Sequence, residues 1–134
     1  SKAIAKIDMR LVAAQDGNKI LDNLKQYIKK LGYDNVEVIC HGITEPAKTP
    51  VDTPYLLPVE KATRNVFGPY MVYPNRPSSA PDYLWTNVLK LPAIQVRWSD
   101  ADSDNHAPNE HLTLSNYIKG TELTATVLKE ISEM

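Results

Sequence analysis

The chain has 134 residues, of which 43% are hydrophobic and 23% charged, values close to those of an average soluble domain. Its 15 basic and 16 acidic residues give a net charge of −1, which argues against nucleic acid or a membrane surface as partner. No apolar run approaches the roughly 20 residues of a membrane span, and residues 1–6 are too polar for a signal peptide. The single cysteine, Cys40, cannot form an internal disulfide, so we expect a cytoplasmic protein.

The first 42 residues predict a β-α-β unit. Residues 4–11 alternate in hydrophobicity, which indicates a strand with one wet face. A helix follows, with Asp16 as its N-cap, apolar residues at helical spacing and Gly32 as the stop. Residues 36–40 indicate a second strand, whose cysteine we expect in the core.

A proline-rich region divides the chain, since eight of the ten prolines lie between Pro46 and Pro81. Residues 41–54 hold three of them and a glycine, which excludes regular structure there. Beyond this connection we expect a helix over 53–68, a strand over 70–73, a rigid turn over 74–81, a short helix over 82–90, a strand over 93–98 and a final helix from about Thr113.

The final helix carries a stripe of residues at helical spacing that we expect to face the core: Leu114, Tyr117, Ile118, Thr121, Ala125, Leu128 and Ile131. The predicted order of elements is β-α-β followed by α-β-α-β-α. Alternation of strands and helices predicts an α/β fold, with α+β as the alternative.

His106 is the first candidate for chemistry, because it lies in a polar loop between a predicted strand and the final helix. Asp100, Asp102 and Asp104 precede it and Glu110 follows, a donor set that suits zinc, cobalt or manganese. An ordinary solvated acidic loop explains the same spacing, and on spacing alone it is the favoured explanation.

Arg10 and the serine pair Ser78 and Ser79 are candidates for binding an anion. An arginine on an open sheet face binds a carboxylate through two hydrogen bonds, although pairing with Asp8 is the simpler explanation. The serines lie in a turn before a helix, where hydroxyls and backbone N–H groups hold an anion or cap the helix. The sequence has no CxxC, HExxH, HxD or GxSxG motif and no pair of adjacent glutamates.

Three segments together resemble the zinc metallopeptidases and amidohydrolases that include acetylornithine deacetylase, succinyl-diaminopimelate desuccinylase, aminoacylase and carnosinase. SDNHAPNEHLTLSNYIKGTELTATVLKEI resembles the C-terminal end of this family, where a HAPNE or HSxNE loop precedes the last long helix. AKIDMRLVAAQDGNKILDNLKQYIKKLG resembles the strand and helix of the family's lid domain, with Ala13-Ala14 where Pro-Asn is common. SSAPDYL lies where the family has a Gly/Ser-rich loop, and it lacks the usual glycines.

The resemblance implies roles for four residues. His106 matches the family's last zinc ligand, Arg10 matches the lid arginine that binds the substrate carboxylate, and Ser78 and Ser79 match the loop that contacts the same carboxylate. The family's HxD ligand, bridging aspartate, general base and adjacent glutamate ligand are absent from this sequence. The resemblance therefore implies that the chain is the C-terminal portion of a two-zinc hydrolase, which cleaves amide bonds of N-acyl amino acids or peptides. It also implies that this portion is inactive by itself.

The resemblance also implies a domain arrangement and partners. Residues 1–42 match the second half of a ferredoxin-like lid and dimerisation domain, and residues 43–134 match the last part of the catalytic domain. The implied cofactor is zinc, with two ions in the intact enzyme and with cobalt or manganese as alternatives. That this portion by itself binds no metal is a further alternative. The implied partners are the substrate, the missing N-terminal part and a second copy bound through the lid strand and helix. A non-catalytic assembly module, or a remnant of such an enzyme, is the alternative.

Overall fold

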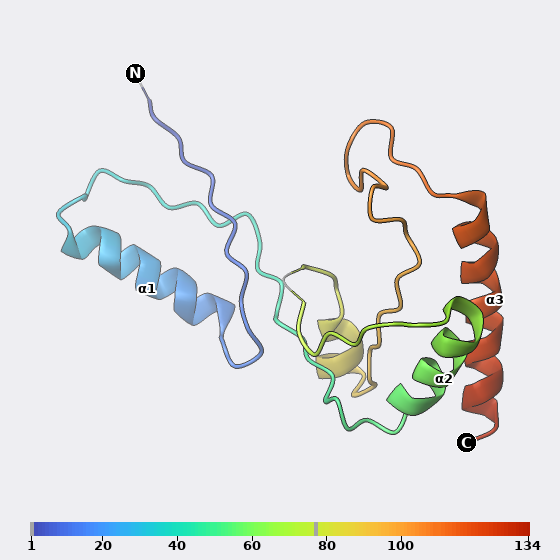
Figure 1. The fold of residues 1–134 in the computed structure, drawn as a ribbon. Coiled ribbons are helices and arrows are strands. Elements are labelled where there is room, and N and C mark those ends of the chain that lie inside the picture. Colours follow the sequence, from blue (N-terminus) through green and yellow to red (C-terminus); the bar gives the residue numbers. More distant parts are fainter. Residues whose placement is uncertain (1, 77) are drawn as a thin grey trace. The chain divides into compact units, whose positions relative to one another are not determined.

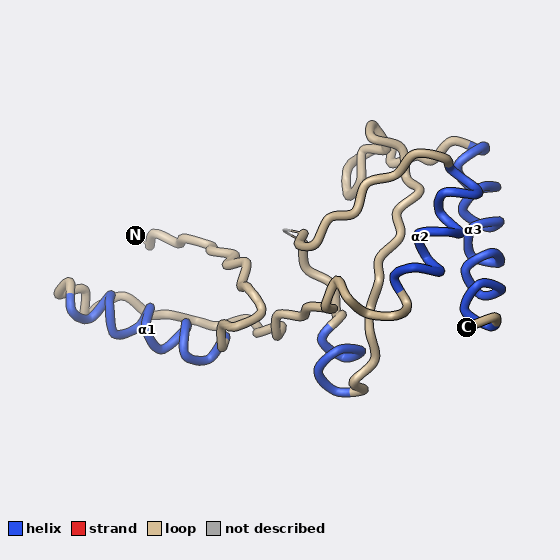
Figure 2. Tube along the Cα trace, turned by 60° about the horizontal axis from the view of Figure 1, so that its bottom comes forward, coloured by secondary structure: helices blue, strands red, loops and turns tan. Residues whose placement is uncertain are grey.

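The regular structure of the chain is helical (Figure 1), as seen in a computed structural model that describes residues 2–76 and 78–134. The elements are α1 (Gly17–Lys30), α2 (Leu56–Phe67), a short π-helical turn η1 (Leu84–Val88) and α3 (Leu114–Ser132). Loops join them, and Figure 2 has no strand in the described ranges. None of the helices in these ranges could serve as a membrane-spanning segment.

The predicted α/β fold and its α+β alternative are therefore wrong for the described residues. The segments 4–11, 36–40, 70–73 and 93–98 run as loops, so the β-α-β half of a ferredoxin-like lid and the α-β-α-β-α part of a catalytic domain are not formed. Alternating hydrophobicity measures how well a segment fits a pleated, half-buried surface, and it produces a strand only when a neighbouring strand accepts its hydrogen bonds. These four segments have no such neighbour among residues 2–76 and 78–134.

The chain forms two compact units, each built from two separate stretches of sequence. Unit 1 comprises Ser1–Thr49 and Asn75–Ala93, and unit 2 comprises Pro50–Pro74 and Ile94–Met134. The predicted boundary at residue 42 concerns the domains of an intact enzyme and stays a prediction. Ser1 and Pro77, the latter inside the turn expected over 74–81, lie outside the described residues.

In unit 1, local chemistry sets both ends of α1 as predicted. Asp16 is the N-cap, and its Oδ1 accepts hydrogen bonds from the backbone N–H groups of Asn18 at 2.8 Å and Lys19 at 3.2 Å. Gly32 follows the helix with a φ of 82°, a left-handed conformation that glycine adopts without steric cost. The expected start and stop of this helix are confirmed.

The second stretch of unit 1 is joined to the first by side-chain hydrogen bonds to backbone. Thr49 Oγ1 donates to the carbonyl of Ala93 and accepts from its N–H, both at 2.9 Å. Asn87, in η1, donates to the carbonyl of Pro46 at 3.2 Å. Cys40 is exposed, so its expected place in a core is wrong.

In unit 2, α2 packs against α3, and Figures 1 and 2 both place these helices side by side. Among the described residues, the buried hydrophobic ones are Val59 and Ala62 of α2 and Leu123 of α3, with exposed fractions of 8%, 0% and 1%. Lys61 Nζ donates to Oε2 of Glu130 at 2.6 Å across the pair. This hydrogen bond and the charge of Glu130 raise the pKa of Lys61 above its ordinary value.

The stripe expected to bury α3 lies largely on its exposed side, which corrects the prediction. Leu114, Tyr117, Ile118 and Leu128 are 73%, 62%, 57% and 66% exposed, whereas the buried residues of the helix are Gly120 and Leu123. The helix has apolar residues on both sides. Only tertiary packing decides which side faces α2, so helical spacing alone selected the wrong one.

Candidate functional site

Arg10 lies on the loop that leads into α1, and its guanidinium has two side-chain partners within unit 1. Nη2 forms an ion pair with Oδ2 of Asp8 at 2.9 Å, and Nη1 donates a hydrogen bond to Oγ of Ser79. The side chains of Asp8 and Arg10 are 73% and 52% exposed, so solvent reaches both. A guanidinium has five N–H donors, and these two contacts, the ones made with described residues, leave three for a ligand.

The structure brings Ser79 to Arg10 across 69 positions of sequence. The backbone N–H of Ser78 donates to the carbonyl of Arg76 at 2.9 Å. A turn in which the N–H of Leu84 donates to the carbonyl of Pro81 at 3.0 Å leads from the serine pair into η1. Within the described part of the chain, the hydrogen bond from Arg10 goes to Ser79, and Ser78 has none with Arg10.

The first residue of α1, Gly17, makes a close contact near Arg10 in the sequence. Gly17, the first residue of the helix, is buried, and a Cβ placed on it would lie 2.4 Å from Cγ2 of Ile43 and 3.6 Å from Cδ1 of Leu11. Only glycine allows this approach. The start of α1 therefore packs closely against Ile43, in the segment that follows the helix, and against Leu11, the residue next to Arg10.

His106 lies in unit 2, in a loop of unusual backbone conformation. Asp104, His106 and Asn109 have φ values of 50°, 63° and 65°. Non-glycine residues adopt this left-handed region at a cost, and such residues cluster at functional sites. Asn, Asp and His adopt it more readily than other residues, so the residue types in DNHAPN are a sequence signal for this left-handed conformation, which the interpretation as metal ligands did not use.

The two ends of this loop are held together at the start of α3. Oδ2 of Asp100 accepts from the backbone N–H of Thr113 at 2.7 Å, and its Oδ1 accepts from the side chains of Thr113 at 3.2 Å and Asn116 at 2.6 Å. One turn further in, the N–H of His111 donates to the carbonyl of Ser103 at 3.0 Å. Asp100 therefore holds Thr113, the N-cap residue of α3, a role other than the metal binding considered for it.

The residues around His106 do not form a metal site by themselves. His106 is exposed, Asp100 is hydrogen-bonded to Thr113 and Asn116, and His111 Nδ1 lies 3.0 Å from the carbonyl of Asn109. Among the described residues, no group of three or more His, Cys, Asp or Glu side chains could hold a metal ion. A catalytic zinc takes three protein ligands, so His106 alone does not fit a complete zinc centre.

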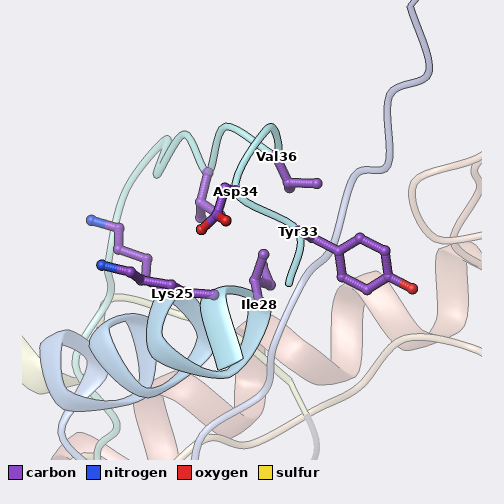
Figure 3. A pocket seen from close by; sticks show the side chains of 7 residues that line it. Lys25, Ile28, Tyr33, Asp34 and Val36 are labelled. Carbon is purple, nitrogen blue, oxygen red and sulfur yellow. The ribbon is translucent and has the colours of Figure 1, made fainter. Parts of the chain in front are cut away.

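A shallow hollow of about 370 Å³ lies beside the C-terminal half of α1, and no sequence pattern indicated it. Figure 3 shows Ile28 directed into the hollow and the ring of Tyr33 directed away from it. The lining residues are Lys25, Ile28, Lys29, Tyr33, Asp34, Val36 and Val38. The hollow contains none of the predicted site residues.

The structure thus joins two of the four predicted site residues, Arg10 and Ser79, and describes His106 within a loop of its own unit. It adds Asp8 as the charged partner of the arginine. Comparison with known proteins gives no match to a protein-family model, to a curated protein or to a solved structure.

Proposed function

We propose that this chain supplies the substrate-carboxylate site and one metal ligand of a two-zinc hydrolase that cleaves amide bonds of N-acyl amino acids or peptides. The observation that carries the proposal is the hydrogen bond from Arg10 to Ser79. The family resemblance implies that these two residues contact the same substrate carboxylate, and residues 69 positions apart meet only if the fold brings them together. The exposed free thiol of Cys40 suits the reducing cytoplasm, where we place this activity.

In this proposal Arg10 binds and orients the substrate. A guanidinium presents parallel N–H donors that match the two oxygens of a carboxylate, and a serine hydroxyl beside it donates a further hydrogen bond. Anchoring the carboxylate fixes the direction in which the neighbouring amide points, which is how a positioning residue lowers an activation barrier. His106 is proposed as a single zinc ligand, with the remaining ligands and the general base on another polypeptide segment.

Carboxylate binding is the direct test of this site. Titration of the chain with N-acetyl-leucine, followed by NMR shifts of backbone amides, is expected to perturb residues near Arg10 and Ser79. Arg10→Ala should abolish the perturbation. Arg97→Ala is the matched control, because Arg97 also donates to a serine hydroxyl, that of Ser99 at 3.3 Å, in unit 2. Equal binding by both variants would remove the basis of the proposal.

The chain alone is expected to be inactive, since in this proposal it supplies His106 as its one metal ligand and the general base lies on another segment. The measurement is hydrolysis of N-acyl amino acids and dipeptides after addition of zinc or cobalt, with His106→Ala as the control. Turnover by the unaltered chain above that of the variant would contradict the expected inactivity.

A non-catalytic assembly module, which includes a remnant of such an enzyme, is the second proposal, and the exposed apolar residues of unit 1 favour it. Ile4, Ile7 and Val12 are 82%, 70% and 65% exposed on a segment whose backbone has no strand partner among the described residues. Such a segment is available to pair with a second copy of the chain, together with α1. Sedimentation equilibrium with metal analysis separates the proposals: a metal-free dimer supports assembly, and a monomer with one equivalent of tightly bound zinc contradicts it.

A further inference from the structure

Asp8 is bonded to one edge of the guanidinium whose other terminal nitrogen contacts Ser79. The distance from Asp8 Oδ2 to Arg10 Nη2 is 2.9 Å, and both side chains are more than half exposed. The pair therefore presents a negative and a positive charge, directly adjacent, to the same solvent. The described residues provide no other ion-pair partner for Arg10.

This arrangement of charges matches one class of small molecule. A free α-amino acid carries a carboxylate and an ammonium separated by a single carbon, so its two charges are adjacent and opposite, like those of Arg10 and Asp8. The carboxylate pairs with the remaining N–H donors of Arg10, and the ammonium pairs with the acceptor oxygens that Asp8 still offers. An N-acylated amino acid has lost the ammonium and presents only a carboxylate, which the nearby Asp8 repels.

We propose that Asp8 makes the Arg10 site selective for zwitterions, so that a free amino acid binds more tightly than its N-acylated form. The inference rests on the proposed function, in which Arg10 binds a carboxylate, and adds that the site favours the amino acid released by cleavage over the acylated substrate. Two unit charges about 4 Å apart in water interact by an energy that corresponds to about a fivefold change in a binding constant. We therefore expect a preference of about fivefold or more.

The test compares leucine with N-acetyl-leucine at pH 7 on the full chain, by NMR titration. The unaltered chain is expected to bind leucine about fivefold more tightly. Asp8→Asn keeps the size of the side chain, removes its charge and is expected to reverse the order, weakening leucine and strengthening N-acetyl-leucine. Asp22→Asn, which removes an exposed carboxylate from α1, is the matched control and should leave the order unchanged.

The outcomes separate the inference from the function on which it rests. If N-acetyl-leucine binds the unaltered chain at least as tightly as leucine, or if Asp8→Asn does not change the order, the selectivity is refuted while the carboxylate site stands. If Arg10→Ala binds both ligands as the unaltered chain does, or if neither ligand binds, the carboxylate site itself is refuted and the selectivity with it.

Discussion

Gly120 is the residue at which α3 accepts a neighbour most closely. A Cβ at this position would lie 2.6 Å from Cδ1 and from Nε1 of Trp98, closer than side chains approach one another in folded proteins. The indole therefore packs directly on the helix backbone. Helix propensity gives no account of a glycine in the middle of a 19-residue helix, and this contact does.

Gly120→Ala is expected to destabilise unit 2 by about 1 kcal/mol. Alanine gains about 1 kcal/mol of helix propensity, but displacing the indole costs about 1–3 kcal/mol of overpacking. Urea denaturation followed by circular dichroism measures the change, with Thr121→Ala at the neighbouring exposed position as the control. In a Trp98→Ala background the same glycine substitution should stabilise the chain, and a destabilisation there would contradict the proposed clash.

At this scale much of the structure follows from sequence. The side chain of Asp16 and the missing Cβ of Gly32 act within a few residues of themselves, so the ends of α1 were predictable from local chemistry. The final helix, expected from about Thr113, begins at Leu114, and Thr113 is its N-cap, with Oγ1 accepting from the N–H of Asn116 at 3.3 Å. The pairing of Arg10 with Asp8 was foreseen as one of two alternatives, but its link to Ser79 depends on the path of the chain between them.

At the scale of elements, α3 and the loop before it form one structural piece. Asp100 lies near the N-terminal end of the helix, where the backbone N–H groups and the helix dipole favour a negative charge. It also closes the loop that carries His106, through its bonds to Thr113 and Asn116. The stability of the helix terminus and the position of the histidine are therefore linked.

Asp100→Ala is expected to destabilise unit 2 by about 1–2 kcal/mol, because the charge-assisted hydrogen bonds to the N-cap residue Thr113 and to the side chain of Asn116 are lost. The local signs are faster hydrogen exchange at the amides of residues 113–117 and faster proteolytic cleavage within residues 101–112. Asp102→Ala, at an exposed position of the same loop, is the control. Equal exchange rates in the two variants would mean that the carboxylate of Asp100 does not hold the loop.

Element positions were predictable where capping and breaking residues mark them, and less so elsewhere. Gly68, with a φ of 84°, ends α2 as expected, but the helix begins at Leu56, two residues after Thr53-Pro54. Pro58 is tolerated because N–H groups of the first helical turn have no partner within the helix. The orientation of α3 was not predictable, since both sides of the helix carry apolar residues.

For the whole molecule, the main error of prediction is the sheet. Helices satisfy their hydrogen bonds within one segment, whereas strands require a partner that is distant in sequence, so a single alternating segment such as 4–11 does not determine whether a ladder forms. The division of each unit into two separate stretches is likewise a long-range property. The contacts of Arg10 were predictable only in part: Asp8 is two positions away, whereas Ser79 is 69 positions away and meets Arg10 only through the path of the chain.

The exposed apolar stripe of α3 has a consequence for the handling of this protein in a cell. Leu114, Ile118 and Leu128 leave a folded helix with the kind of surface that unfolded chains show to chaperones. A chaperone that binds exposed apolar side chains is therefore expected to bind α3 in the folded chain as well as in an unfolded one.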